Sequence, residues 1–206
     1  NGRTIKSRYS TPNRVDKIKE PIQSIFWIMK DDALPPLVKI TDPRLASILG
    51  CTLMTKRSTA ENTGAGANLD ALVIEPYANP FRVYPLVEDY EKFKALFDKD
   101  VDCYIINTGD FLGKKVTKEV SLGVIETVVD GKANFELFGG LPGMEYLPVE
   151  GYEVPEMSGD YAELIRDRMQ FRLDYLKAFN DANPEHQIPQ DALESIKTIE
   201  RFIDVL

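Results

Sequence analysis

The chain has 206 residues, of which 43% are hydrophobic and 28% are charged, so it can bury a core and is not disordered by composition. Its formal net charge of -8 argues against nonspecific binding to nucleic acid or to an anionic membrane, because both would repel it. The length suits one large domain or two small ones.

Three features bear on where the protein works and how much of it this chain represents. No secretory-type segment is visible and no apolar run approaches the roughly 18 residues of a membrane span, so we expect a cytoplasmic protein. Cys103 lies in an apolar run and Cys51 in a helix-like stretch, and both are expected to be reduced core thiols. Because the chain opens at Asn1 without an initiator Met, we expect a fragment cut from a longer protein.

The first half of the chain predicts one buried strand, one helix and one long loop. Residues 1–21 are polar and irregular, whereas residues 22–29 form an apolar run rich in β-formers that indicates a strand. A helix is expected to begin at residues 41–43 (Thr-Asp-Pro), where a cap precedes a proline, and to end near residue 55. Residues 55–70 are small, polar and glycine-containing, and a loop of this length is usually functional or disordered.

The second half predicts a second buried strand and more helices. Residues 101–106 are apolar and end abruptly at Asn-Thr-Gly, residues 107–109. Residues 136–157 contain several glycines and prolines and should be extended and irregular. Helices are predicted by apolar spacing and by end signals over residues 87–97, 119–129, 159–180 and 190–205. This order of elements predicts an α/β fold.

Several common chemistries lack the residues they need. His186 is the only histidine and lies in a polar connection between the last two helices, so a solvated loop position is expected. A Ser-His-Asp or Cys-His nucleophile would need that histidine buried, and one histidine with two isolated cysteines gives no zinc spacing. The sequence also has no glycine-rich phosphate loop followed by Lys-Ser/Thr.

Other charged and aromatic residues favour structural interpretations. The charges of the predicted helix over 87–97 and those of residues 163–168 are typical of solvated, mixed-charge helix faces. Four aromatic residues of the penultimate helix are expected to be core or docking residues rather than a stacking platform: Tyr161, Phe171, Tyr175 and Phe179.

The stretch from residue 101 to residue 121 is the strongest candidate for a binding site. A buried strand ends in a turn, two adjacent lysines follow, Lys114 and Lys115, and then a helix begins. Ligands collect in loops beyond strand ends in α/β sheets, and a helix start offers free N–H groups. The alternative is an ordinary strand-turn with exposed lysines, which the local pattern alone slightly favours.

These residues resemble the C-terminal part of ATP-dependent phosphoenolpyruvate carboxykinases. The family has an apolar strand ending in Asn-Thr-Gly, a glycine loop ending in Gly-Lys-Arg and a helix that opens near a Thr. The corresponding run here is CYIINTGDFLGKKVTKEVSLGVIETVVDG, residues 103–131. Residues 22–41, IQSIFWIMKDDALPPLVKIT, are similar to the family's strand, acidic residue and Leu-Pro-Pro, and the likeness extends in order over roughly residues 1–131.

The resemblance implies a fold and a set of site residues. The fold would be a mixed sheet flanked by helices, like the family's nucleotide-binding half, over residues 1–157, with extra helices over 158–206 packed on it. Nucleotide-binding positions carried over from the family are Asn107, Thr108, Gly109, Lys114, Lys115, Val116 and Ser121. Among these, Lys115 takes the place of the nucleotide-contacting Arg.

Within the same resemblance, Val116 replaces the apolar residue beside adenine, and Ser121 replaces the Thr near the base. Arg8 stands for the Arg that contacts the transferred phosphate and the carboxylate substrate, so it is the catalytic candidate. The loop over residues 55–70, with Thr59 and Glu61, falls where the family has its mobile lid.

The resemblance also implies partners and a reaction. The nucleotide would be ATP or a relative, and the family's phosphate loop and its ligands for Mg or Mn would belong to a missing N-terminal half. The first hypothesis is thus the nucleotide side of an enzyme that converts oxaloacetate and ATP to phosphoenolpyruvate, ADP and CO2, with no activity of its own. Asp110 instead of an aromatic residue and Lys115 instead of Arg mark a divergent branch. The alternatives are a non-catalytic relative with a binding or structural role, and a helical interaction module.

Overall fold

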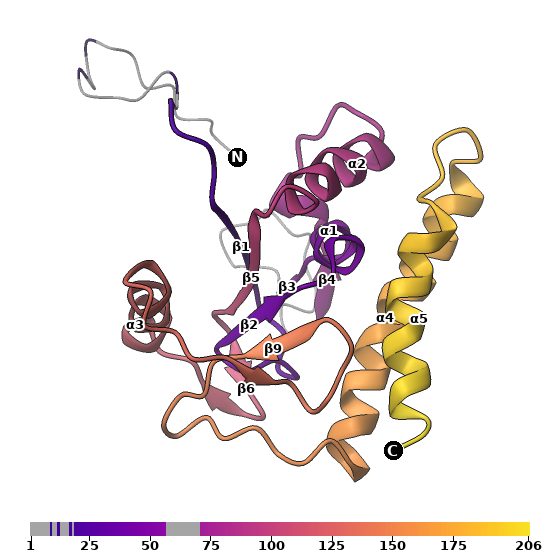
Figure 1. Ribbon diagram of the computed structural model, residues 1–206. Coiled ribbons are helices and arrows are strands. Elements are labelled where there is room, and N and C mark those ends of the chain that lie inside the picture. Colours follow the sequence, from indigo (N-terminus) through magenta and orange to yellow (C-terminus); the bar gives the residue numbers. More distant parts are fainter. Residues whose placement is uncertain (1–8, 10–11, 13–16, 18, 57–70) are drawn as a thin grey trace, which may run out of the picture.

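The structure, a computed structural model, describes residues 9, 12, 17, 19–56 and 71–206. Its centre is a five-stranded mixed sheet in the order β1-β5-β2-β9-β8 (Figure 1). The strands are β1 (Ser24–Met29), β2 (Leu37–Ile40), β5 (Asp102–Asn107), β8 (Glu136–Leu137) and β9 (Met144–Tyr146). The helices are α1 (Pro43–Cys51), η1 (Pro76–Ala78), α2 (Leu86–Phe97), α3 (Lys118–Val129), α4 (Gly159–Ala182) and α5 (Gln190–Ile203). The predicted α/β class, a mixed sheet with flanking helices, is confirmed.

The central strands β2 and β5 are buried on both faces, and their alternate residues point to opposite sides of the sheet. Cys103 and Ile105 of β5 belong to the larger core, which includes residues of α1, α2, α4 and α5. Tyr104 and Ile106 point the other way and pack with Val124 of α3. In Figure 1, α3 accordingly lies apart from the other helices, across the sheet.

Strand directions bring three chain segments together at one end of the sheet. β1 runs parallel to β5, with Met29 opposite Asn107, so both strands end at the same place. β2 is antiparallel to β5 and therefore begins there. The Asn107 N–H donates to the Pro36 carbonyl, which ties the start of β2 to the end of β5. The residues that follow β1 and β5 thus meet around the connection from β1 to β2.

The last two helices form an antiparallel hairpin that packs on α1 (Figure 1). Ile196, Ile199 and Ile203 of α5 are buried at helical spacing and join the main core. Asn180 closes the hairpin, because its side chain bonds both the N–H and the carbonyl of Ile188. His186 lies exposed in the connection, as expected for a loop histidine. No helix among the described residues is long and apolar enough to cross a membrane.

Helix α1 is shorter than predicted, and the reason lies outside it. It ends at Cys51 rather than near residue 55, because Met54–Lys56 instead form β3, which pairs with β4, Leu72–Ile74. Met54 is fully buried and its carbonyl accepts from the Lys30 N–H, so the segment is pinned beside the end of β1. Most of the proposed lid, residues 57–70, lies outside the described residues.

Both cysteines are free and buried, as the sequence predicts. Burial raises the pKa of the Cys51 thiol to about 12, so its reactive thiolate is scarce at neutral pH. Its sulfur lies 3.0 Å from the Tyr77 hydroxyl inside the core. Cys51 is therefore a packing residue.

Two helical glycines allow a matched test of the packing around α1. A Cβ at Gly50 would lie 2.6 Å from the Tyr77 ring and 2.9 Å from the Trp27 ring. Because both rings are packed, we expect Gly50→Ala to destabilise the fold by about 1–3 kcal/mol through overpacking. A Cβ at Gly123 of α3 would meet nothing within 4 Å, so Gly123→Ala should stabilise by about 0.5–1 kcal/mol. Urea unfolding of the two variants checks the contrast, and equal effects would contradict it.

Candidate functional site

The candidate site lies at the end of β5, where the Asn107 side chain organises the turn. Asn107 is fully buried, and its Nδ2 lies 2.8 Å from the Asp31 carbonyl, 2.6 Å from that of Leu34 and 2.9 Å from that of Asp110. Its Oδ1 accepts from the Gly109 N–H at 2.9 Å. The buried amide therefore holds the turn and the connection between β1 and β2 in one arrangement.

Thr108 and Gly109 complete this turn against the end of β1. The Thr108 N–H donates to the Met29 carbonyl, which continues the parallel ladder one step past β5. A Cβ at Gly109 would lie only 3.2 Å from Lys30 Cα, so a larger residue would push the two segments apart. Asn-Thr-Gly is thus a turn whose three residues each have a structural task, whatever else they bind.

A short hairpin follows the turn and carries the two lysines. β6 (Asp110–Phe111) pairs with β7 (Lys114–Lys115) through a two-residue turn, Leu112 with φ 47° and Gly113 with φ 80°. Positive φ at both turn residues is typical of a tight hairpin, and glycine suits the second position. The sequence predicted a loop here, and the hairpin sends the two successive lysine side chains to opposite sides.

Lys114 is engaged with the segment that follows β9. Its Nζ donates to the Gly151 carbonyl and lies 4.7 Å from the centre of the Tyr152 ring, a cation–π arrangement. The pKa of Glu153 lies below its usual range because its own N–H and that of Gly151 donate to it, with a smaller contribution from Lys114. Lys114 therefore fastens the hairpin to this segment.

Lys115 has a different environment. It is exposed, and its Nζ donates to the Thr108 carbonyl at 3.1 Å, which leaves further N–H donors for another group. The Lys115 carbonyl accepts from the Tyr152 hydroxyl at 2.6 Å, so the backbone beneath the side chain is held in place. Both lysines are exposed, and Lys115 is the one whose ammonium group lies at the Asn-Thr-Gly turn.

Val116 and Ser121 lie further from solvent than their predicted roles suggest. Val116 is only 2% exposed and its side chain belongs to the main core. Ser121 is half-buried in α3, and its hydroxyl donates to the Thr117 carbonyl at 3.1 Å, a common bond for a helical serine. Thr117 caps α3 by accepting from the Val120 N–H. The start of α3 thus follows the hairpin directly, as the sequence predicts.

Three predicted residues lie outside the described residues, namely Arg8, Thr59 and Glu61. Two described residues of the proposed lid region, Thr55 and Lys56, belong to β3. Within the described ranges, no group of three or more His, Cys, Asp or Glu side chains could hold a metal ion. The described residues therefore offer no set of ligands for the Mg or Mn that the resemblance implies.

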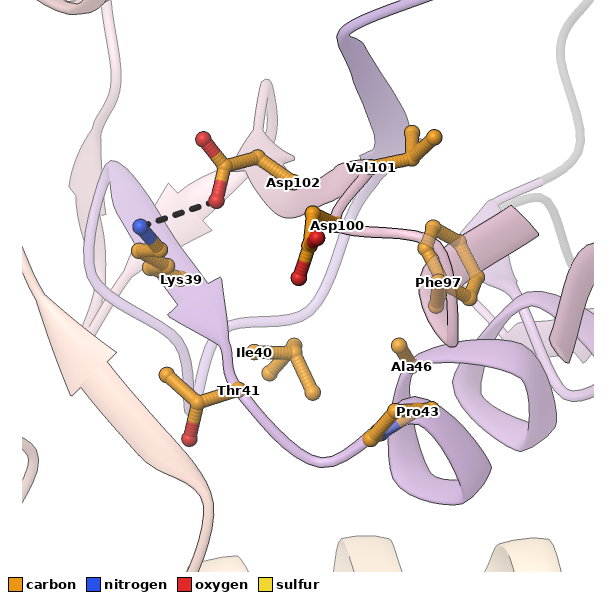
Figure 2. A pocket seen from close by; sticks show the side chains of 9 residues that line it. All are labelled: Lys39, Ile40, Thr41, Pro43, Ala46, Phe97, Asp100, Val101 and Asp102. Carbon is orange, nitrogen blue, oxygen red and sulfur yellow. Dashed lines mark ion pairs between the residues drawn. The ribbon is translucent and has the colours of Figure 1, made fainter. Parts of the chain in front are cut away.

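Two of the cavities lie along α3 and at the end of the sheet opposite the turn. A groove of about 350 Å³ runs between α3 and residues 147–150, and it is lined by Val120, Gly123, Val124, Thr127, Leu147, Pro148, Val149 and Glu150. A second cavity of about 250 Å³ lies where β2 ends and β5 begins, between Lys39, Asp102 and Phe97 (Figure 2). The Lys39–Asp102 ion pair, 2.9 Å long, spans its rim. Neither cavity is lined by Lys115 or Ser121.

Sequence analysis missed a buried ion cluster next to the turn. Asp31 and Arg172 are fully buried and paired, and Arg168 contacts both Asp31 and Asp32. The prediction that residues 163–168 form a solvated face is therefore wrong for Arg168, whose side chain is only 21% exposed. Two features of the sequence could have indicated this cluster. The two arginines are one helical turn apart, and an acidic pair directly follows a buried strand.

No protein-family model matches this chain, and no curated protein sequence matches it.

Proposed function

We propose that this chain forms the nucleotide side of a phosphoenolpyruvate carboxykinase-like phosphotransferase. The observation that carries the proposal is the convergence at the ends of β1 and β5, where the Asn107 turn, the Lys115 ammonium and the start of α3 follow one another. In α/β sheets, ligands bind beyond the carboxyl ends of strands. The order of these parts is the one that the resemblance requires.

The residues divide into those that would touch nucleotide and those that hold them. Lys115 would contact the nucleotide, because its charge is exposed and its backbone is fixed by Tyr152. Ser121 would lie near the base, where its hydroxyl oxygen can still accept a hydrogen bond. Asn107 and Lys114 would act on the shape of the site: the Asn107 amide is buried and bonded to backbone carbonyls, and the Lys114 ammonium is directed to Gly151 and the Tyr152 ring rather than to the turn.

In the proposed reaction, oxaloacetate loses CO2 and the resulting enolate oxygen attacks the terminal phosphorus of ATP, releasing ADP and phosphoenolpyruvate. Phosphoryl transfer depends on positioning and on electrostatic stabilisation rather than on covalent chemistry by the protein. This chain would contribute one wall and a fixed positive charge from Lys115. The phosphate loop and the metal ligands would come from elsewhere in the protein, and Mg or Mn would neutralise phosphate charge when bound.

The proposal predicts a specific loss on removing the Lys115 charge. In the full-length protein, we expect Lys115→Ala to weaken ATP binding about tenfold, the size of one partly screened charged contact. Lys132→Ala is the matched control, because Lys132 is also exposed and pairs with Asp130 beyond the end of α3, away from the start of that helix. It should change the affinity less than about twofold. Isothermal titration with Mg·ATP measures both.

The outcomes separate the hypotheses. Equal affinities for wild type and Lys115→Ala would remove Lys115 from the site. If the wild-type protein binds no nucleotide, the proposal of an enzyme is wrong, and the alternative of a non-catalytic relative with a binding or structural role is favoured. ATP binding without formation of phosphoenolpyruvate from oxaloacetate would leave a nucleotide-binding protein that does not perform the transfer.

A further inference from the structure

The connection between β1 and β2 is held from one side by the candidate turn. The Asn107 amide donates to the carbonyls of Asp31 and Leu34, and the Leu112 N–H donates to the carbonyl of Asp32 at 3.0 Å. All three acceptors are backbone atoms. A shift of residues 31–34 would therefore move the partners that set the position of the turn and the hairpin.

The same residues are held from the other side by α4. Arg172 Nη2 and Arg168 Nε each lie 3.2 Å from a carboxylate oxygen of Asp31, and Arg168 Nη2 lies 2.6 Å from Asp32 Oδ1. The hydroxyl of Tyr161, which lies near the start of α4, donates to the Ala33 carbonyl at 2.9 Å. Helix α4 thus contacts three successive residues of the connection through polar groups.

These contacts are made where polar groups are costly. Asp31 and Arg172 are both fully buried, and the described residues offer no partner for Arg172 Nε. Burial lowers the pKa of Arg172, although Asp31 acts in the opposite direction. An apolar cluster would pack such a site with a smaller desolvation cost, so an ion cluster is weak evidence for stability alone. The ion cluster instead fixes the positions of the two carboxylates, because a planar guanidinium group bonds a carboxylate in only a few geometries.

We infer that Arg168 and Arg172 are positioning residues for the nucleotide site: α4 sets the 31–34 connection, and the connection sets the Asn107 turn, whose Thr108 carbonyl holds the Lys115 ammonium. This inference rests on the proposed function for its effect on nucleotide binding. Its structural half, the coupling of α4 to the turn, is testable without any ligand.

Arg168→Gln in the full-length protein is the most informative variant. It removes the contacts to Asp31 and Asp32 but leaves the Arg172–Asp31 pair, so the buried carboxylate keeps one cationic partner. The amides of Gly109 and Leu112 report on the turn, since their acceptors are Asn107 Oδ1 and the Asp32 carbonyl. We expect their hydrogen exchange to accelerate about tenfold and the Mg·ATP affinity to fall about three- to tenfold.

Two further variants make the readout specific. Arg166→Gln removes an ion pair of the same helix, 2.9 Å long, but its partner is Asp204 beyond α5, so the turn should be unaffected. Arg168→Lys keeps the charge but cannot reach both carboxylates with a planar fork, so it should restore part of the affinity. A purely structural role would not predict this order among variants of equal thermal stability.

Each outcome supports or overturns a stated part of the inference. Unchanged exchange at Gly109 and Leu112 in Arg168→Gln overturns the coupling, and so does acceleration spread evenly over the whole protein. A looser turn with unchanged ATP affinity overturns the positioning role. If the turn loosens but the wild type itself binds no ATP, the coupling stands and the proposed function fails.

Discussion

Replacing Arg172 with alanine should lower the free energy of unfolding by about 3–5 kcal/mol. The substitution leaves the carboxylate of Asp31, which is fully buried, with Arg168 as its remaining cationic partner. It also empties the volume of one of the largest fully buried side chains of the chain. Urea unfolding followed by the fluorescence of Trp27, the only tryptophan, measures the loss.

A double variant separates the charge from the volume. Arg172→Met combined with Asp31→Asn removes both charges while keeping similar shapes, and the asparagine can still accept from the Ala33 N–H as Asp31 does. We expect this pair to recover most of the lost stability, because buried ion pairs are often replaceable by neutral groups. A loss of less than about 1 kcal/mol in Arg172→Ala would show that Asp31 finds other compensation.

Removing the Asn107 amide should lower the free energy of unfolding by at least about 3 kcal/mol, because each buried polar group left without a partner costs about 1–3 kcal/mol. The side chain has two N–H hydrogens for three carbonyl acceptors, so its bonds are shared. Asn107→Ala would remove the amide from all three carbonyls, of which that of Asp31 still accepts from the Leu34 N–H, and would leave the Gly109 N–H without its Oδ1 acceptor. Asn107→Asp keeps the shape but sets a carboxylate against those carbonyls, so it should be at least as damaging as alanine near neutral pH. Urea unfolding of the three proteins gives the comparison.

Thr108→Val is the control for Asn107, because it changes the next residue of the same turn. The Thr108 hydroxyl makes one long bond, 3.3 Å, to the Met29 carbonyl, and that carbonyl also accepts from the Thr108 N–H, which valine retains. We expect a loss below about 1 kcal/mol. If Thr108→Val were as costly as Asn107→Ala, the amide would not be the main fastening of the turn.

The turn therefore has two properties that fit together. Its backbone is held by Asn107 and by the connection from β1 to β2, whereas Lys115, whose ammonium bonds the Thr108 carbonyl of the turn, is exposed. Binding sites need such a division, because a charged group positions a ligand only when its own support is fixed. The proposed function depends on this division, and the arginines of α4 extend the support by one more layer.

Local sequence patterns were sufficient to predict the elements whose bounds are set by their own residues. The predicted strand over 22–29 and the helix over 119–129 match β1 and α3 within two residues at each end. Apolar runs and an Asp-Gly stop, with Gly131 at φ 68°, determine these locally. The placement of Lys114 and Lys115 just before a helix also follows from chain order alone.

The remaining features depend on partners that are distant in sequence. α1 ends early because β3 pairs with β4 and bonds to Lys30, which no pattern within residues 43–55 encodes. Arg168 belongs to a charged run that is typical of a solvated face, and only the docking of α4 against the end of β1 buries it. The two lysines are adjacent in sequence and both are exposed, yet Lys114 bonds the Gly151 carbonyl and Lys115 bonds the Thr108 carbonyl of the turn, because a hairpin alternates its side chains. The sequence by itself determined where the turn lies and which charges follow it, whereas tertiary packing decided where each of those charges is directed and what holds the turn in place.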